Sequence, residues 1–131
     1  MSLPVLVIGR SGSGKTYSLK NFKPDEIGVI SVEKGRLPFK SDIKTVSIPD
    51  FGAEDGCTDY RSINAAKYSW LMSVIEKSKA KSIAIDDSQY LLVNELFDRA
   101  GEKGYDKFTE MAANFRNLIH YINNLPEDDK I

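Results

Sequence analysis

Residues 4–16 read Pro4-Val5-Leu6-Val7-Ile8-Gly9-Arg10-Ser11-Gly12-Ser13-Gly14-Lys15-Thr16. The last eight positions match G-x-x-x-x-G-K-T, a pattern whose glycines let successive backbone N–H groups point inward at a phosphate. The apolar residues before it predict a strand over residues 3–8, buried on both faces of a parallel sheet, and we expect a helix over residues 14–22. A strand, a glycine-rich loop and a helix in this order indicate a phosphate-binding loop in an α/β fold.

The loop predicts that the chain binds a nucleotide, ATP or ADP, together with Mg²⁺. Lys15 is expected to reach the β- and γ-phosphate oxygens, which also makes it a catalytic candidate, and the Thr16 hydroxyl is expected to ligate Mg²⁺. The alternative is a Gly/Ser turn that joins a strand to a helix and binds nothing. The predicted nucleotide-binding residues are Gly9, Arg10, Ser11, Gly12, Ser13, Gly14, Lys15, Thr16 and Tyr17.

Length and composition describe an ordinary globular domain. The 131 residues are 41% hydrophobic and 28% charged, which predicts a single domain over residues 1–131. The 18 basic residues nearly balance the 19 acidic ones, so overall charge does not favour a nucleic-acid or membrane surface. A lone cysteine, Cys57, excludes an internal disulfide and fits a reducing cytoplasm. We expect no membrane association, because no stretch approaches the roughly 20 apolar residues of a membrane span.

The rest of the chain alternates between strand and helix patterns. Apolar runs predict further strands, and apolar residues at helical spacing predict helices between and after them. Such alternation is typical of a parallel sheet flanked by helices. The expected strands cover residues 27–32, 45–48 and 82–86, and the expected helices cover residues 60–75, 89–100 and 106–124.

Three acidic residues are predicted at the carboxyl ends of strands. Asp86 and Asp87 close the strand over residues 82–86, and Glu33 follows the strand over residues 27–32. In a parallel sheet these ends line the ligand crevice, on the same side as the phosphate-binding loop. Asp86 is expected to hold the hydration shell of Mg²⁺, because this cation is anchored through carboxylates and phosphates. Asp87 either polarises the attacking water or caps the next helix, and Glu33 is either a catalytic base or a solvated acid.

The order of these motifs resembles the RecA-like core of recombination ATPases. Residues 34–40, 85–91 and 103–110 further resemble phage and prophage nucleotide-binding proteins that are related to single-strand-annealing ATPases, and the resemblance extends over residues 5–131. It implies a P-loop ATPase of a homo-oligomeric kind, located in the cytoplasm of a bacterial host and acting in DNA recombination. It also implies that Glu33 activates water against the γ-phosphate.

One departure from that family concerns the end of the sequence. In the family, the helix after the Asp86 strand is followed by another strand, which inserts between the phosphate-loop strand and the Asp86 strand. This sequence ends at Ile131, where that strand is expected to start. The resemblance therefore implies a RecA-like core that is incomplete at its C-terminus, with an unfilled position in the sheet and weak ATP hydrolysis.

Several other residues and two other function classes stay open. Arg36 and Arg99 are candidates for stabilising phosphate charge on a neighbouring subunit. Lys103, Tyr105 and Lys107 either contact single-stranded DNA or form the solvated start of a helix. A small-molecule P-loop kinase and a non-catalytic nucleotide-binding or assembly module are the alternatives to an ATPase. Phosphate release without a phosphorylated acceptor would favour the ATPase.

Overall fold

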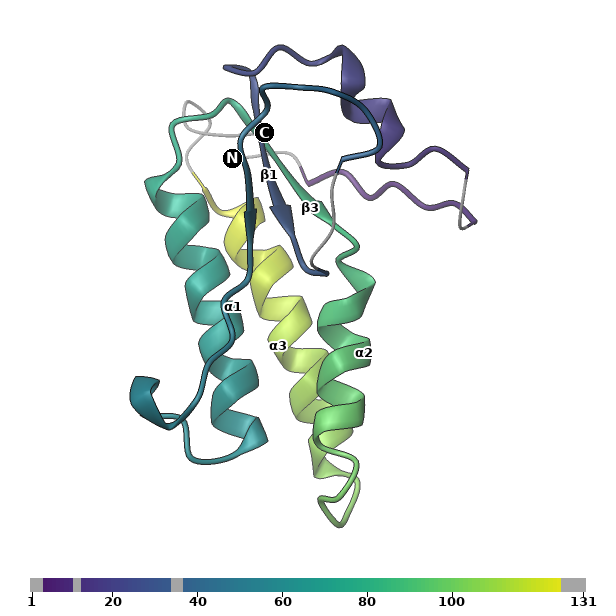
Figure 1. The fold of residues 1–131 in the computed structure, drawn as a ribbon. Helices are drawn as coiled ribbons and strands as arrows, with labels where there is room; N and C mark the ends of the chain where they lie inside the picture. Colours follow the sequence, from purple (N-terminus) through teal and green to yellow (C-terminus); the bar gives the residue numbers. More distant parts are fainter. Residues whose placement is uncertain (1–3, 11–12, 34–36, 126–131) are drawn as a thin grey trace.

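The computed structural model describes residues 4–10, 13–33 and 37–125, and they form an α/β fold. A three-stranded parallel sheet of β1 (Ile27–Ser31), β2 (Thr45–Ser47) and β3 (Ser82–Asp86) is flanked by helices. Figure 1 shows the sheet at one end of the molecule and the helices extending beyond its carboxyl edge. The helices are η1 (Tyr17–Asn21), η2 (Ala53–Asp55), α1 (Tyr60–Lys77), α2 (Gln89–Asp98) and α3 (Asp106–Asn123).

The strand order is β2-β1-β3, so β1 is the central strand. Ser31 lies opposite Asp86 on β3 and opposite Ser47 on β2, which aligns the carboxyl ends of all three strands. The strands predicted over residues 27–32, 45–48 and 82–86 are confirmed, and the first two end one residue earlier than expected. Side chains that follow β1 and β3 therefore meet at one edge of the sheet.

β1 is buried on both of its faces. Ile30 packs into a cluster with Leu71, Leu91 and other residues of the helices, and it is 2% exposed. Val29 points to the opposite face, where Ile43 is its buried neighbour. Successive residues of a strand face opposite sides, so one apolar run fills two clusters. The sequence predicted that residues 3–8 would form the strand buried on both faces, but in the structure that strand is β1.

The helices α1, α2 and α3 lie side by side. α1 begins at a capping box, in which Ser62 N donates to Asp59 Oδ1 over 2.8 Å and the Ser62 side chain interacts with the Asp59 backbone. The predicted helices are confirmed with small differences at their ends. The helix expected over residues 89–100 ends at Asp98, and the one expected over residues 106–124 ends at Asn123.

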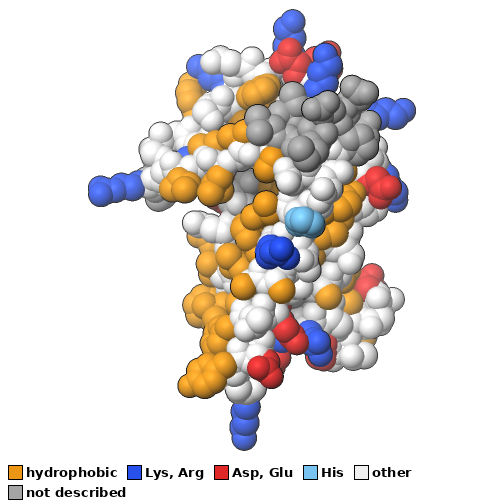
Figure 2. All heavy atoms as spheres, turned by 180° about the vertical axis from the view of Figure 1, so that it is seen from behind, with side chains coloured by type: hydrophobic (Ala, Val, Ile, Leu, Met, Phe, Trp, Pro, Cys, Tyr) orange, Lys and Arg blue, Asp and Glu red, His pale blue; other side chains and the backbone are white. Residues whose placement is uncertain are grey.

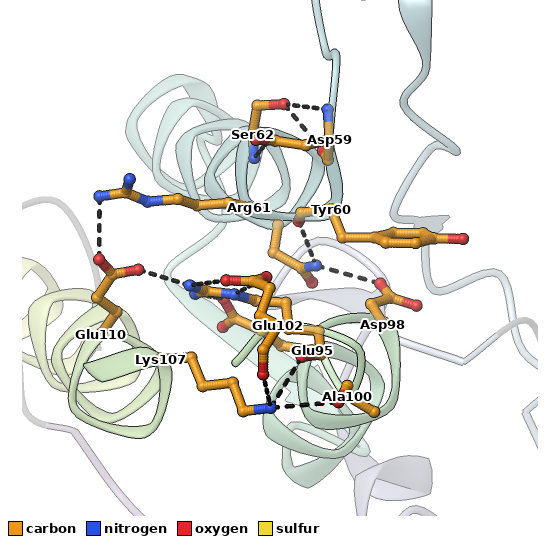
Figure 3. Close-up of polar contacts among 12 residues, drawn as sticks. Asp59, Tyr60, Arg61, Ser62, Glu95, Asp98, Ala100, Glu102, Lys107 and Glu110 are labelled. Atoms are coloured by element: carbon orange, nitrogen blue, oxygen red, sulfur yellow. Dashed lines mark hydrogen bonds and ion pairs between the residues drawn. The ribbon is translucent and has the colours of Figure 1, made fainter. Parts of the chain in front are cut away.

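A buried arginine holds the far ends of these helices together. Arg99, which follows α2, is 2% exposed and binds three carboxylates from two helices and the turn between them. Its nitrogens lie 3.1 Å from Glu95, 2.7 Å from Glu102 and 2.6 Å from Glu110. Figure 3 shows these carboxylates converging, with Lys107 donating to backbone carbonyls at the end of α2. The cluster fixes how α3 follows α2.

The prediction of a strand over residues 3–8 is wrong for the residues that the structure describes. Residues 4–10 have no regular secondary structure, and the side chains of Val5, Leu6, Val7 and Ile8 are 62–83% exposed. A strand needs a partner for its backbone hydrogen bonds, and none of the described strands pairs with this segment. The helix expected over residues 14–22 is a short 3-10 helix, Tyr17–Asn21.

The outer edge of β3 has no partner strand among the described residues. On its inner edge β3 pairs with β1 along all five of its residues. The resemblance to the RecA-like core implied an unfilled position between this strand and a phosphate-loop strand over residues 3–8, but the described residues 4–8 form no strand. An apolar strand with one unpaired edge presents backbone N–H and C=O groups that require another strand or water.

The face of the molecule that is turned away from the reader in Figure 1 carries an apolar groove. Figure 2 shows hydrophobic side chains gathered along the helical part of this face. The groove has a volume of about 390 Å³ and is lined by residues of α2 and α3 that include Phe108, Met111, Phe115 and Ile119. Phe108 and Ile119 are each 44% exposed. None of the described helices is long and apolar enough to cross a bilayer.

Candidate functional site

The site lies where β1 and β3 end. Asp86 is the last residue of β3, and Glu33 follows the end of β1 by two positions. The Thr16 hydroxyl donates a hydrogen bond to Asp86 Oδ1 over 2.8 Å, although the two residues are 70 positions apart. The structure therefore brings together the two side chains that the sequence assigned to Mg²⁺. A hydroxyl and a carboxylate oxygen are suitable ligands for this cation.

Asp87 has an unusual backbone and a perturbed pKa. Its φ of 56° places it in the left-handed region, which aspartate tolerates better than most residues, and the chain turns there from β3 into α2. Desolvation raises the pKa of the Asp87 carboxyl above its usual 3.8, the negative charges of Asp86 and Glu33 raise it further, and Lys15 opposes them. The Asp87 side chain is exposed, but charge repulsion gives the same direction as desolvation. Four predicted site residues thus share one electrostatic environment.

Lys15 folds back onto its own loop. Its ammonium donates to the carbonyl oxygens of Gly9 and Arg10, over 2.6 Å and 2.9 Å. Gly14, just before it, has a φ of 90°, a conformation that favours glycine. To reach a phosphate, the ammonium must exchange two carbonyl contacts for phosphate oxygens.

The remaining residues of the predicted loop are only partly described. Ser13 N donates to the Arg10 carbonyl over 3.1 Å, and the Tyr17 ring contacts the Phe39 ring edge-on at 5.9 Å between centroids. Ser11 and Gly12 lie outside the described residues, as does Arg36. The short 3-10 helix after the loop means that the expected α-helix N-terminus is not part of this arrangement.

The suggestion that Arg99 acts on a neighbouring subunit is wrong. Arg99 is buried, and its hydrogen bonds to Glu102, Glu110 and Glu95 raise its pKa despite desolvation. An arginine that acts on another subunit has to be exposed. The DNA-contact alternative is also weakened for Lys107, whose ammonium binds three backbone carbonyl oxygens near the end of α2, whereas Tyr105 is 85% exposed.

Sequence reasoning missed Asn94. Asn94 Nδ2 donates to Glu33 Oε1 over 2.9 Å and so links α2 to the segment that follows β1. Both residues line a pocket of about 240 Å³, together with side chains that include Asp50, Lys67 and Tyr90. The sequence offered only a weak signal, an amide in the apolar helical run Tyr-Leu-Leu-Val-Asn, and it did not indicate which residue the amide contacts.

The described residues contain no group of three or more His, Cys, Asp or Glu side chains placed to hold a metal ion. Magnesium in a phosphate-binding site takes most of its ligands from phosphate and water, so one hydroxyl and one carboxylate from the protein are enough. Thr16 and Asp86 fit that requirement. The prediction of Mg²⁺ is compatible with the donor set but depends on a bound nucleotide.

Comparison with known proteins finds no relative: no protein-family model, no curated protein and no solved structure matches the chain.

Proposed function

We propose that this chain binds ATP or ADP with Mg²⁺ and hydrolyses ATP, as a RecA-like P-loop ATPase. The observation that carries the proposal is the hydrogen bond between Thr16 Oγ1 and Asp86 Oδ1, 2.8 Å long. The G-x-x-x-x-G-K-T pattern predicts a metal-ligating hydroxyl at Thr16, and an acid at the end of a parallel strand downstream of such a loop predicts a metal-ligating carboxylate at Asp86. Two predictions made from separate parts of the sequence thus meet at one point.

Each residue of the site has a role in this proposal. Lys15 leaves the carbonyls of Gly9 and Arg10 and binds the β- and γ-phosphate oxygens. Thr16 and Asp86 would hold Mg²⁺, which supplies positive charge against the phosphates. In hydrolysis, the oxygen of a water bonds to the γ-phosphorus, the bond to the β,γ-bridging oxygen breaks, and the water proton passes to the Glu33 carboxylate.

The biological role depends on the resemblance. Residues 34–40, 85–91 and 103–110 resemble phage proteins related to single-strand-annealing ATPases, which supports a role in DNA recombination. Phosphate release with and without single-stranded DNA tests that role. Nucleotide binding without phosphate release would favour the non-catalytic module instead, and a phosphorylated acceptor would favour the kinase.

The binding step is tested by isothermal titration calorimetry with Mg²⁺ and ATP. Lys15→Ala should weaken binding by roughly 1.5–3 kcal/mol, because it removes a charge-assisted contact to phosphate. Lys23→Ala, which removes an exposed ammonium outside the loop, is the matched control and should bind as the wild type does. Equal affinity of Lys15→Ala and Lys23→Ala would overturn the proposal.

The metal assignment has its own test in the same titration. Asp86→Asn should weaken nucleotide binding when Mg²⁺ is present and leave it unchanged in EDTA, because Asp86 acts on the cation and not on the nucleotide. A variant that is equally impaired in EDTA would show that Asp86 has another role.

A further inference from the structure

The amide of Asn94 and the carboxylate of Glu33 connect two elements at the carboxyl edge of the sheet. The hydrogen bond from Asn94 Nδ2 to Glu33 Oε1 is 2.9 Å long, and both side chains are half-buried. Hydrogen bonds to an ionised carboxylate are stronger than those between neutral groups and hold the carboxylate in a defined direction. The bond spans 61 positions of the sequence, so it is a tertiary contact and not a local turn.

Asn94 lies on a helix that is fixed at both of its ends. α2 starts at Gln89, directly after the turn at Asp87 and Ser88, and Asp86 is the last residue of β3 before that turn. Near its other end, Glu95 is 0% exposed and binds the buried Arg99. A continuous helix transmits these constraints, so Asn94 keeps its place relative to Asp86.

The pocket of about 240 Å³ beside this pair leaves room for the Glu33 side chain to move. Glu33, Asn94, Lys67 and Asp50 all line it. If the Asn94 amide were absent, the carboxylate could turn toward this space. The contact with Asn94 selects one of the available orientations.

We propose that Asn94 is a positioning residue, which holds Glu33 in the orientation needed to accept the proton of the attacking water. This inference rests on the proposed function, because it assigns a role in the hydrolysis step. Asn94 acts through Glu33: among the described residues, its side-chain amide donates to Glu33 and not to the phosphate-binding loop or Asp86. Loss of Asn94 should therefore lower kcat and leave nucleotide affinity unchanged.

The experiment compares three variants by steady-state phosphate release and by calorimetric titration with ATP and Mg²⁺. Asn94→Leu keeps the approximate shape without the donor and should lower kcat at least about tenfold, with KM and Kd within roughly twofold of the wild type. Asn94→Gln restores an amide donor and should recover most of the lost kcat. Asn114→Leu is the matched control, because Asn114 also donates to a glutamate, Glu95, over 3.4 Å but outside the site.

Each result has a defined meaning. If Asn94→Leu and Asn114→Leu share the wild-type kcat while nucleotide binds normally, the role of Asn94 is refuted and nucleotide binding stands. If Asn94→Gln is as slow as Asn94→Leu, or if both change Kd, Asn94 is not acting by positioning Glu33. If the wild type binds nucleotide without releasing phosphate, both the catalytic role of Glu33 and the inference are refuted. If the wild type binds no nucleotide, the proposed function itself fails.

Discussion

Replacing Arg99 by methionine should destabilise the protein severely. Arg99 is the cation against which Glu95 is buried, and these side chains are 2% and 0% exposed. Removing the guanidinium leaves the Glu95 charge without its partner, and Glu95 Oε1 already has no hydrogen-bond partner among the described residues. Breaking a buried ion pair in this way costs about 3–5 kcal/mol. Domains of this size are stable by roughly 5–15 kcal/mol, so the loss would be a large part of the total.

The magnitude can be checked by urea unfolding followed through the fluorescence of Trp70, the single tryptophan, which packs against the core. Arg61→Met is the matched control, because Arg61 pairs with Glu110 at 3.0 Å but its side chain is 67% exposed. An exposed pair contributes about 0–1 kcal/mol. Figure 3 shows Arg61 approaching Glu110 from α1, on the outside of the same cluster.

A second variant separates lost charge pairing from lost packing. The double substitution of Arg99→Met with Glu95→Met removes both buried charges and should recover most of the stability, because apolar residues replace a buried ion pair at little cost. The reasoning would be refuted if Arg99→Met cost less than about 1 kcal/mol. It would also be refuted if the double variant were no more stable than Arg99→Met, since the cost would then come from packing.

Two further predictions concern carboxylates with shifted pKa values. The pKa of Asp87 is raised above 3.8 in the folded state, so the folded protein holds this proton more tightly than the unfolded chain does. The contribution of Asp87 to stability is therefore complete below pH 3.8 and is lost as the pH rises through the raised folded pKa. Asparagine also tolerates a positive φ, so Asp87→Asn should remove this loss and leave stability at pH 7 equal to or higher than that of the wild type. Urea unfolding at pH 3 and pH 7 measures the effect, and lower stability of the variant at pH 7 would contradict the prediction. The pKa of Asp59 is lowered below 3.8, first by its hydrogen bond from the Ser62 backbone, so its contribution is complete above that pH and is lost as the pH falls through the folded value. Asp59→Ala should therefore lower the thermal midpoint more at pH 7 than at pH 2, and equal effects at both pH values would exclude a contribution from the Asp59 charge.

The strands of the sheet could be predicted where the sequence shows both an apolar run and the polar residues that end it. Residues 83–85 are apolar, and the acidic pair Asp86-Asp87 marks the end of the strand, which the structure places at Asp86. The amphipathic helices follow their apolar spacing in the same way. These features are local, because each depends on the residues within one segment.

The candidate site was partly predictable for a similar reason. Parallel strands place their carboxyl ends at one edge, so Glu33 and Asp86 could be assigned to the same crevice before any pairing was known. The Asn94 contact and the burial of Arg99 could not be obtained in this way. Both depend on how α2 is rotated against its neighbours, and the sequence of α2 alone does not fix that rotation.

Under the proposed function, the segment before the predicted phosphate-binding loop couples nucleotide binding to folding. Residues 5–8 have the composition of a buried strand but remain exposed, because a strand depends on a distant partner that local sequence does not specify. Gly9 and Arg10 follow directly, and their carbonyl oxygens hold Lys15. Under the proposed function, a phosphate that binds Lys15 removes the partner of these two carbonyls, which directly follow residues 5–8 in the chain. A ligand shifts a conformational equilibrium only by its difference in affinity for the two states, so phosphate would reposition this segment only if it binds the paired and unpaired arrangements with different affinity.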